Sequence, residues 1–136
     1  MCLDTTQERD ELDGLSNKII GAAIRVHDEL GPGLLESAYE VCLGFELTDE
    51  GYRIERQVPV PLVYRGRHLE CGYRIDLLVE NKVVVEVKSV DRLEPVHTAQ
   101  LISQLRLRGL KLGLLINFNV RSLRQGIRRV VNGLPE

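Results

Sequence analysis

The stretch YRIDLLVENKVVVEVK, residues 73–88, contains two apolar, β-branched runs separated by a short polar break. The runs predict strands at residues 73–79 and 83–90, and because both faces are apolar we expect helices on both sides of the sheet. Acidic residues nevertheless interrupt the runs, with Asp76 in the first and Glu86 in the second. A charge inside a buried strand raises the free energy of the folded state unless a partner compensates it. This stretch therefore decides the fold and also marks a candidate site.

The length of the turn between the two runs decides whether the carboxylates meet. A three-residue loop at 80–82 would place Asp76 directly opposite Glu86, with Cβ atoms about 5 Å apart. A two-residue loop would place Asp76 opposite Val87 and would separate the two carboxylates. Alternation along a strand puts Glu86 and Lys88 on one face in either case. The sequence leaves both registers open.

The residue types in this stretch suit a divalent metal ion. Carboxylate oxygens such as those of Asp76 and Glu86 bind Mg²⁺ or Mn²⁺ and leave positions for water and a phosphate group. The metal would acidify its water, and Lys88 could position that water or stabilise the transition state. The alternative interpretation is an ordinary Lys–Glu pair on a solvated face, although strands that are apolar on both sides are poor places for solvated charges.

The rest of the chain predicts a mixed α/β domain. Glycine and proline at 31–33 separate two early helices, and Pro95 suits the first turn of a third helix. The predicted helices are residues 15–30, 34–50, 96–108 and 120–132, and the predicted strands outside the opening stretch are 52–60, a hairpin of 62–64 and 68–71, and 112–118.

Length and composition predict one globular domain of 136 residues. We expect residues 15–136 to form that domain and the acidic residues 1–14 to be mobile. No apolar run approaches the roughly 20 residues of a membrane span, and the polar N-terminus does not resemble a signal peptide, so we expect no membrane partner and a cytoplasmic location. Three widely spaced cysteines predict neither a disulfide framework nor a zinc site.

Basic residues concentrate late in the chain, although the net charge of −2 does not indicate a nucleic-acid binder. Three of these arginines recur at i, i+3 and i+7 of the helix predicted at 120–132, a pattern more often found on a solvated face. If the protein binds DNA, the candidates for phosphate contacts are Arg106, Arg108, Lys111, Arg121, Arg124 and Arg128, with Arg65 and Arg67 of the hairpin as weaker candidates.

The sequence pattern of residues 73–88 resembles that of the PD-(D/E)XK nuclease superfamily. In that pattern an aspartate follows apolar residues on one strand, and Glu-x-Lys follows apolar residues on the adjacent strand. Residues 33–39, GLLESAY, are similar to the G-x-x-E-x-x-Y signature of the small GxxExxY family within this superfamily, and residues 100–119 also resemble that family. The resemblance covers about residues 15–131. It implies an α/β fold with a restriction-endonuclease-like αβββαβ core, a mixed central sheet flanked by helices, and an extra N-terminal helix.

The resemblance also implies roles for the residues of the opening stretch. Asp76, Glu86 and Lys88 would form the catalytic triad, with Mg²⁺ or Mn²⁺ as cofactor. Asp76 and Glu86 would be the main metal ligands, and the carbonyl of Val87 would face the same metal. Glu36 would reach that metal from the early helix.

The resemblance also concerns four residues outside the opening stretch. Without the resemblance, Glu36 is simply a first-turn glutamate that favours the positive end of the helix dipole, and Tyr39 is better explained as a core residue. Gln100 matches a glutamine that helps to orient the site in related nucleases. The role of Gln104 stays open, because the wider group often has a tyrosine at that position.

The leading hypothesis is a metal-dependent nuclease that hydrolyses phosphodiester bonds, with DNA as the expected substrate. The alternative is a module of the same fold with little or no turnover, which binds nucleic acid or another protein. The small size of the domain is compatible with a homodimer in either case.

Overall fold

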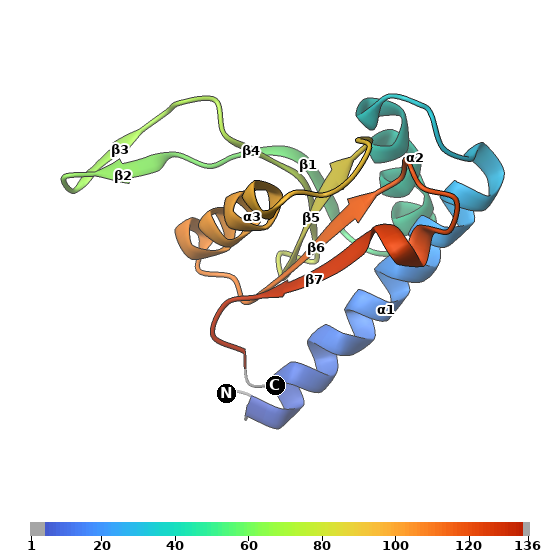
Figure 1. Ribbon diagram of the computed structural model, residues 1–136. Coiled ribbons are helices and arrows are strands. Elements are labelled where there is room, and N and C mark those ends of the chain that lie inside the picture. Colours follow the sequence, from blue (N-terminus) through green and yellow to red (C-terminus); the bar gives the residue numbers. More distant parts are fainter. Residues whose placement is uncertain (1–4, 135–136) are drawn as a thin grey trace.

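The computed structural model describes residues 5–134, which form a central sheet with helices on both faces (Figure 1). α1 (Thr5–Leu30) and α2 (Glu36–Asp49) cover one face, and α3 (Pro95–Arg108) covers the other. The predicted α/β architecture is therefore confirmed.

The main sheet has the strand order β1-β4-β5-β6-β7. β5 and β6 run parallel, and α3 connects them because a parallel pair needs a long crossover, whereas all other neighbours are antiparallel. The sheet is therefore mixed, as expected. Its strands are β1 (Ile54–Pro59), β4 (Arg74–Val79), β5 (Val83–Lys88), β6 (Leu112–Asn117) and β7 (Ile127–Val131).

β5 lies at the centre of the sheet and is buried on both faces. Val83, Val85 and Val87 pack in the core beneath α1 and α2, whereas Val84 packs in the core beneath α3. This alternation explains why consecutive residues of the strand, Val83 to Val85, are all apolar. It also means that a charged side chain at Glu86 is placed among apolar neighbours.

The chain after β6 differs from the prediction of a helix at 120–132. It forms a short 3-10 helix, η1 (Leu123–Gly126), and then β7. β-Branched residues of β7 pair with β6, which would otherwise be a sheet edge with unpaired backbone groups. The turn into β7 requires glycine, because a Cβ at Gly126 would lie 2.2 Å from the carbonyl oxygen of Asn117. The predicted helix is wrong, since pairing with a free sheet edge outweighs a helical spacing of arginines.

α1 begins at Thr5, well before the predicted start at residue 15. Residues 5–14, which we expected to belong to a mobile segment, are helical, and Leu12 is buried; residues 1–4 lie outside the described part of the chain. No helix within residues 5–134 is long and apolar enough to span a membrane. The acids of the first turns form ion pairs with bases far along the chain, Glu8 with Lys111, Glu11 with Lys82 and Asp13 with Arg129.

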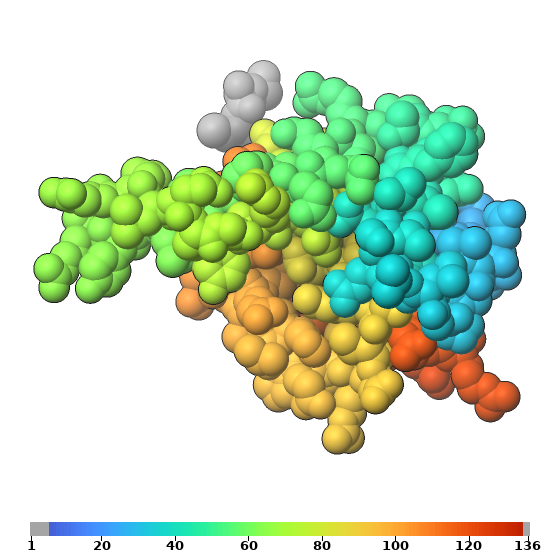
Figure 2. All heavy atoms as spheres, turned by 90° about the horizontal axis from the view of Figure 1, so that it is seen from above, coloured from blue at the N-terminus to red at the C-terminus, as the bar shows by residue number. Residues whose placement is uncertain are grey.

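β2 (Leu62–Tyr64) and β3 (Arg67–Leu69) form a separate two-stranded sheet. The predicted hairpin is confirmed, with its second strand starting and ending slightly earlier than expected. Figures 1 and 2 show that this hairpin projects from the body of the protein. We call residues 61–73 the arm.

Candidate functional site

The turn between β4 and β5 sets the register of the candidate site. The three residues 80–82 connect the strands, and Val79 pairs with Val83. Continued along the strands, this register places Asp76 directly opposite Glu86. Of the two registers that the sequence left open, the one that brings the carboxylates together is confirmed.

The two carboxylates lie where β4 and β5 separate. The last paired residues of the ladder are Leu77 and Val85. Beyond them, the N–H of Val87 donates to Oδ2 of Asp76 at 2.8 Å, and the N–H of Asp76 lies 3.4 Å from Oε1 of Glu86 as a long hydrogen bond. Asp76 and Glu86 therefore lie side by side at the carboxyl end of β5.

α2 brings a third carboxylate to this end of the sheet. Glu40 is only 5% exposed and accepts hydrogen bonds from Arg56 at 2.7 Å and from Gln57 at 2.6 Å. Gln57 also lies 3.4 Å from Oδ1 of Asp76 and so connects the two acids. Consecutive strand residues normally point to opposite faces, but Gln57 has a φ of 53°, which turns β1 so that Arg56 and Gln57 both reach α2.

Glu36, the predicted ligand from α2, is exposed at the first residue of the helix. It precedes Glu40 by four residues, so the two side chains share one face of α2. Its role as a metal ligand stays a prediction. Sequence reasoning missed Glu40, which could have been recognised as a glutamate beside the core positions Tyr39 and Leu43, where a solvated carboxylate is not expected.

Tyr39 is a core residue, as expected, and it also fixes the loop before α2. Its ring stacks on Phe118 with centroids 4.5 Å apart. Its hydroxyl donates to the carbonyl of Gly31 at 2.5 Å and accepts from the N–H of Leu34 at 3.1 Å. Ser89, which follows β5, donates to the carbonyl of Leu34 at 2.6 Å. These contacts dock the start of α2 on the carboxyl end of β5.

Burial and repulsion by a neighbouring carboxylate raise the pKa values of the two central acids. Burial raises the pKa of Glu86 to about 7; the carboxylate of Asp76 adds to the rise, and the ammonium of Lys88, 3.9 Å away, opposes it. Burial also raises the pKa of Asp76, while the hydrogen bond from Val87 opposes the rise and Glu40 adds to it. The site therefore holds more buried negative charge than its cations neutralise.

α3 places one glutamine beside the carboxylates and carries a second one turn earlier. Gln104 is buried beside Glu86, and its amide lowers the pKa of that carboxyl. It donates to the carbonyl of Arg74 at 3.2 Å, and its Oε1 has no hydrogen-bond partner among the described residues. Gln100 is exposed one turn earlier and lines a cavity of about 210 Å³ together with Gln104. Gln104 is thus the glutamine beside the carboxylates, and the orienting role of Gln100 stays a prediction.

Two of the predicted nucleic-acid contacts, Arg108 and Lys111, lie at the far end of the sheet. Because β5 and β6 are parallel, Lys111, directly before β6, is at the opposite end of the strands from Lys88. A strand of this length spans about 17–20 Å. Lys111 pairs with Glu8 at 2.8 Å, and Arg108 lies 3.4 Å from the side-chain oxygen of Asn81. These residues therefore do not adjoin the carboxylates.

The other predicted contacts come from different elements of the fold. Arg106 belongs to the last turn of α3. Arg121, Arg124 and Arg128 do not share a helical face, because their segment forms η1 and β7. Arg128 instead donates to the carbonyl of Leu93 at 3.2 Å. Contacts between these residues and nucleic acid stay a prediction.

The donor set at the carboxyl end of β5 fits a divalent cation. Asp76, Glu86 and Glu40 offer the hard oxygen atoms that Mg²⁺ and Mn²⁺ prefer. Within residues 5–134, no three His, Cys, Asp or Glu side chains form a ready-made metal site, and Glu40 is turned towards Arg56 and Gln57. A cation would offset the charge that raises the pKa values of Asp76 and Glu86. The residues therefore fit such an ion once the side chains adjust to it.

The comparisons with known proteins agree with this geometry. A family model described as the PD-(D/E)XK nuclease superfamily matches residues 13–130. No curated protein and no solved structure matches the chain. The match supports the restriction-endonuclease-like fold expected from the resemblance, whereas the narrower likeness to the GxxExxY family stays a prediction. Over residues 13–130, which include every residue of the candidate site, the chain belongs to the PD-(D/E)XK nuclease superfamily.

Proposed function

We propose that this protein is a Mg²⁺- or Mn²⁺-dependent nuclease that hydrolyses phosphodiester bonds in DNA. The observation that carries the proposal is the buried carboxylate of Glu86 beside the half-buried carboxylate of Asp76, with Lys88 at 3.9 Å from Glu86. Two buried like charges are unfavourable without a counter-ion. Members of this superfamily generally depend on a divalent metal, so a metal is the counter-ion that we expect.

The ligands of that ion would come from three elements. Asp76 and Glu86 supply carboxylates from β4 and β5. The N–H of Val87 faces Asp76, and since the N–H and C=O of a strand residue point to the same side, its carbonyl faces the site too. Glu36 or Glu40 would complete the set from α2. When bound, the ion would polarise the phosphate and acidify a water molecule.

Lys88 supplies the positive charge of the site. It follows Glu86 by two residues in β5, so both side chains lie on one face. Its ammonium would stabilise the negative charge that develops on the phosphoryl oxygens and orient the attacking water. The amides of Gln100 and Gln104 would hold the substrate strand in line, because both line the cavity beside the carboxylates.

The test is cleavage of labelled single- and double-stranded DNA and RNA with Mn²⁺, Mg²⁺ or EDTA. Lys88→Ala is compared with Lys18→Ala, a change of an exposed lysine in α1. We expect metal-dependent cutting of DNA by the wild type and by Lys18→Ala, and a loss of at least about 100-fold in Lys88→Ala. Cutting that survives Lys88→Ala would come from a contaminant and would contradict the proposal.

One observation favours the second candidate function, a nuclease-fold module that acts by binding another protein. Leu35 and Phe45 of the α2 region are 78% and 70% exposed, an unusual exposure for large apolar residues. If neither DNA nor RNA is cut with either metal, while the protein is folded, this second function becomes the better account.

A further inference from the structure

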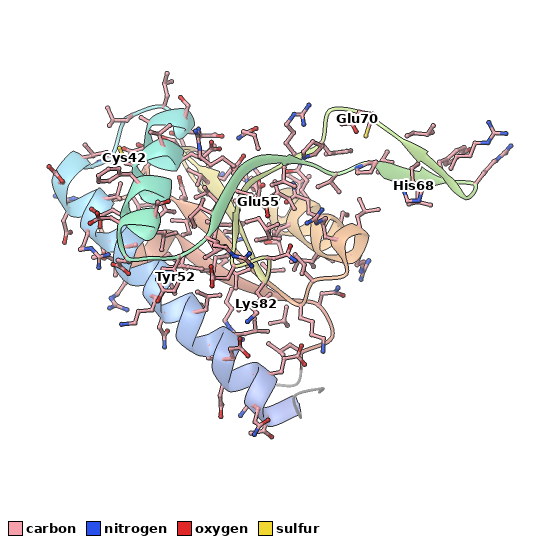
Figure 3. All side chains as sticks on the ribbon, turned by 180° about the vertical axis from the view of Figure 1, so that it is seen from behind. Cys42, Tyr52, Glu55, His68, Glu70 and Lys82 are labelled. Carbon is pink, nitrogen blue, oxygen red and sulfur yellow. The ribbon has the colours of Figure 1, made fainter. Side chains whose placement is uncertain are left out.

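The arm contributes little to the stability of its own domain. Its strand residues are all exposed, and Figure 3 shows the arm, with His68 and Glu70 labelled, extending away from the sheet. A two-stranded hairpin that packs on nothing is marginally stable in water. The exposed side chains of the arm are therefore available to a molecule outside the domain.

The arm returns to the sheet directly at the candidate site. β4 starts at Arg74, whose carbonyl accepts the hydrogen bond from Gln104, and Asp76 follows two residues later. A molecule bound at the carboxylates would therefore extend along the arm. The cavity of about 210 Å³ lies between the base of the arm and α3, and the residues that line it include Val60, Leu62, Tyr73, Gln100, Gln104 and Leu107.

One face of the arm continues this cavity. Residues directly opposite each other in an antiparallel pair share a face. Leu62 pairs with Leu69, and Tyr64 pairs with Arg67, so these four side chains share one face. Because Leu62 lines the cavity, Tyr64 and Arg67 extend the same surface towards the tip.

The tip of the arm carries unneutralised positive charge. Neither Arg65 nor Arg67 forms an ion pair within residues 5–134, whereas half of the lysines and arginines outside the arm do. Arg65 and Gly66 have φ values of 51° and 76°, as in a two-residue hairpin turn where asparagine or glycine is the usual first residue. The guanidinium of Arg65 lies over the ring of Tyr64, 5.5 Å from its centroid. Arg65, a residue with a long cationic side chain, therefore occupies a backbone conformation that favours asparagine or glycine.

We propose that the arm binds B-form double-stranded DNA by entering its major groove, which makes duplex DNA the substrate of the site. The inference rests on the proposed nuclease function. A major groove about 12 Å wide admits a two-stranded ribbon, whereas the narrow major groove of an RNA duplex does not. The chain from Gly66 to Asp76 can span at most about 33 Å, close to one helical turn of DNA. A second copy of the protein fits less well, because two arms would bring unpaired arginines together.

The experiment compares two double variants that each remove two positive charges. Arg65→Ala/Arg67→Ala changes the arm, and Arg53→Ala/Arg129→Ala changes two arginines that pair with acids elsewhere. Binding is followed by fluorescence anisotropy in EDTA, with a labelled DNA duplex of about three turns and its single strand. We expect the arm variant to bind the duplex about tenfold more weakly, with a salt slope smaller by about 1.8, and to change single-strand binding little. The control variant should bind as the wild type does.

Equal weakening in both variants, or none in the arm variant, would overturn the proposal. So would sedimentation in which the arm variant converts a dimer to a monomer without changing DNA binding, since the arm would then serve a second copy. Because binding is measured without metal, the two proposals can fail separately. Arm-dependent duplex binding without cleavage would contradict the nuclease alone, and cleavage with unchanged binding in the arm variant would contradict the role of the arm alone.

Discussion

The charged residues at the two ends of β5 differ in whether a partner of opposite charge neutralises them. At the amino end, Lys82 and the neighbouring Lys111 each pair with a glutamate of α1; we call this the paired end. At the carboxyl end, which we call the acidic end, Glu86 lies beside Asp76 and Lys88 remains 3.9 Å away. Charge that joins elements of the fold is neutralised by a partner. Charge left unbalanced in a buried place raises pKa values and is typical of functional sites.

The sharpest way to break this comparison is to remove one acid from each end. Glu86→Gln at the acidic end should reduce metal-dependent cleavage by about 1,000-fold or more, because a ligand and its charge are lost. Without metal and above about pH 7 the same variant should melt at a higher temperature than the wild type, since it relieves repulsion with Asp76. Glu11→Gln, the control at the paired end, should retain activity. A destabilised Glu86→Gln with full activity would contradict both halves of the prediction.

The pH dependence of stability provides the next largest effect. The pKa of Glu86 rises from 4.5 to about 7 on folding, so the folded state binds this proton more tightly than the unfolded chain does. Stability measured in EDTA should therefore fall as the pH rises from about 4.5 to about 7, by at most about 3 kcal/mol, and this term should then level off. Urea denaturation across this range should give a flatter profile for Glu86→Gln. Parallel profiles would show that Glu86 is not the group responsible.

Variants of the two glutamates Glu36 and Glu40 test which residue of α2 belongs to the acidic end. Glu40 contacts Gln57, which reaches Asp76, whereas Glu36 is exposed one turn earlier. We expect Glu40→Gln to weaken Mn²⁺ binding, measured by calorimetry, by about tenfold and more than Glu36→Gln does. A larger loss in Glu36→Gln would favour the ligand implied by the resemblance.

The smallest effect is expected at the paired end. Lys111→Ala removes a half-exposed ion pair with Glu8, which is worth about 0.5 kcal/mol or less after screening by solvent. Because Lys111 lies at the far end of β5 from Lys88, its loss should leave the dissociation constant for duplex DNA unchanged. A clear weakening of DNA binding would contradict this expectation and would support the prediction from the sequence that Lys111 contacts nucleic acid.

The same comparison explains what the sequence could predict. At the acidic end, the apolar residues that surround Asp76 and Glu86 are close to them in the sequence, so the pattern can be recognised locally. The length of one turn then fixes whether the two acids meet. Strand alternation then places Lys88 without further information. The pattern within sixteen residues therefore predicts the three central residues of the candidate site, whereas the register that brings the two acids together comes from the structure.

Features that depend on distant residues could not be found in this way. β7 forms because β6 offers a free edge, which is not visible in the local spacing of the arginines. Glu40 joins the site through Gln57, whose positive φ is a property of β1 and not of α2. The ion pair of Glu8 with Lys111 joins residues at opposite ends of the sequence.

The central claim is that the unbalanced charge at the acidic end is a site for a divalent metal ion. The most direct measurement is the melting temperature with increasing Mn²⁺ for the wild type, Asp76→Asn and Glu11→Gln. At a metal concentration 100 times the dissociation constant, the wild type and Glu11→Gln should gain about 2.7 kcal/mol, or about 10 °C, and Asp76→Asn should gain almost nothing. An equal rise in all three proteins, or no rise in the wild type, would contradict the claim.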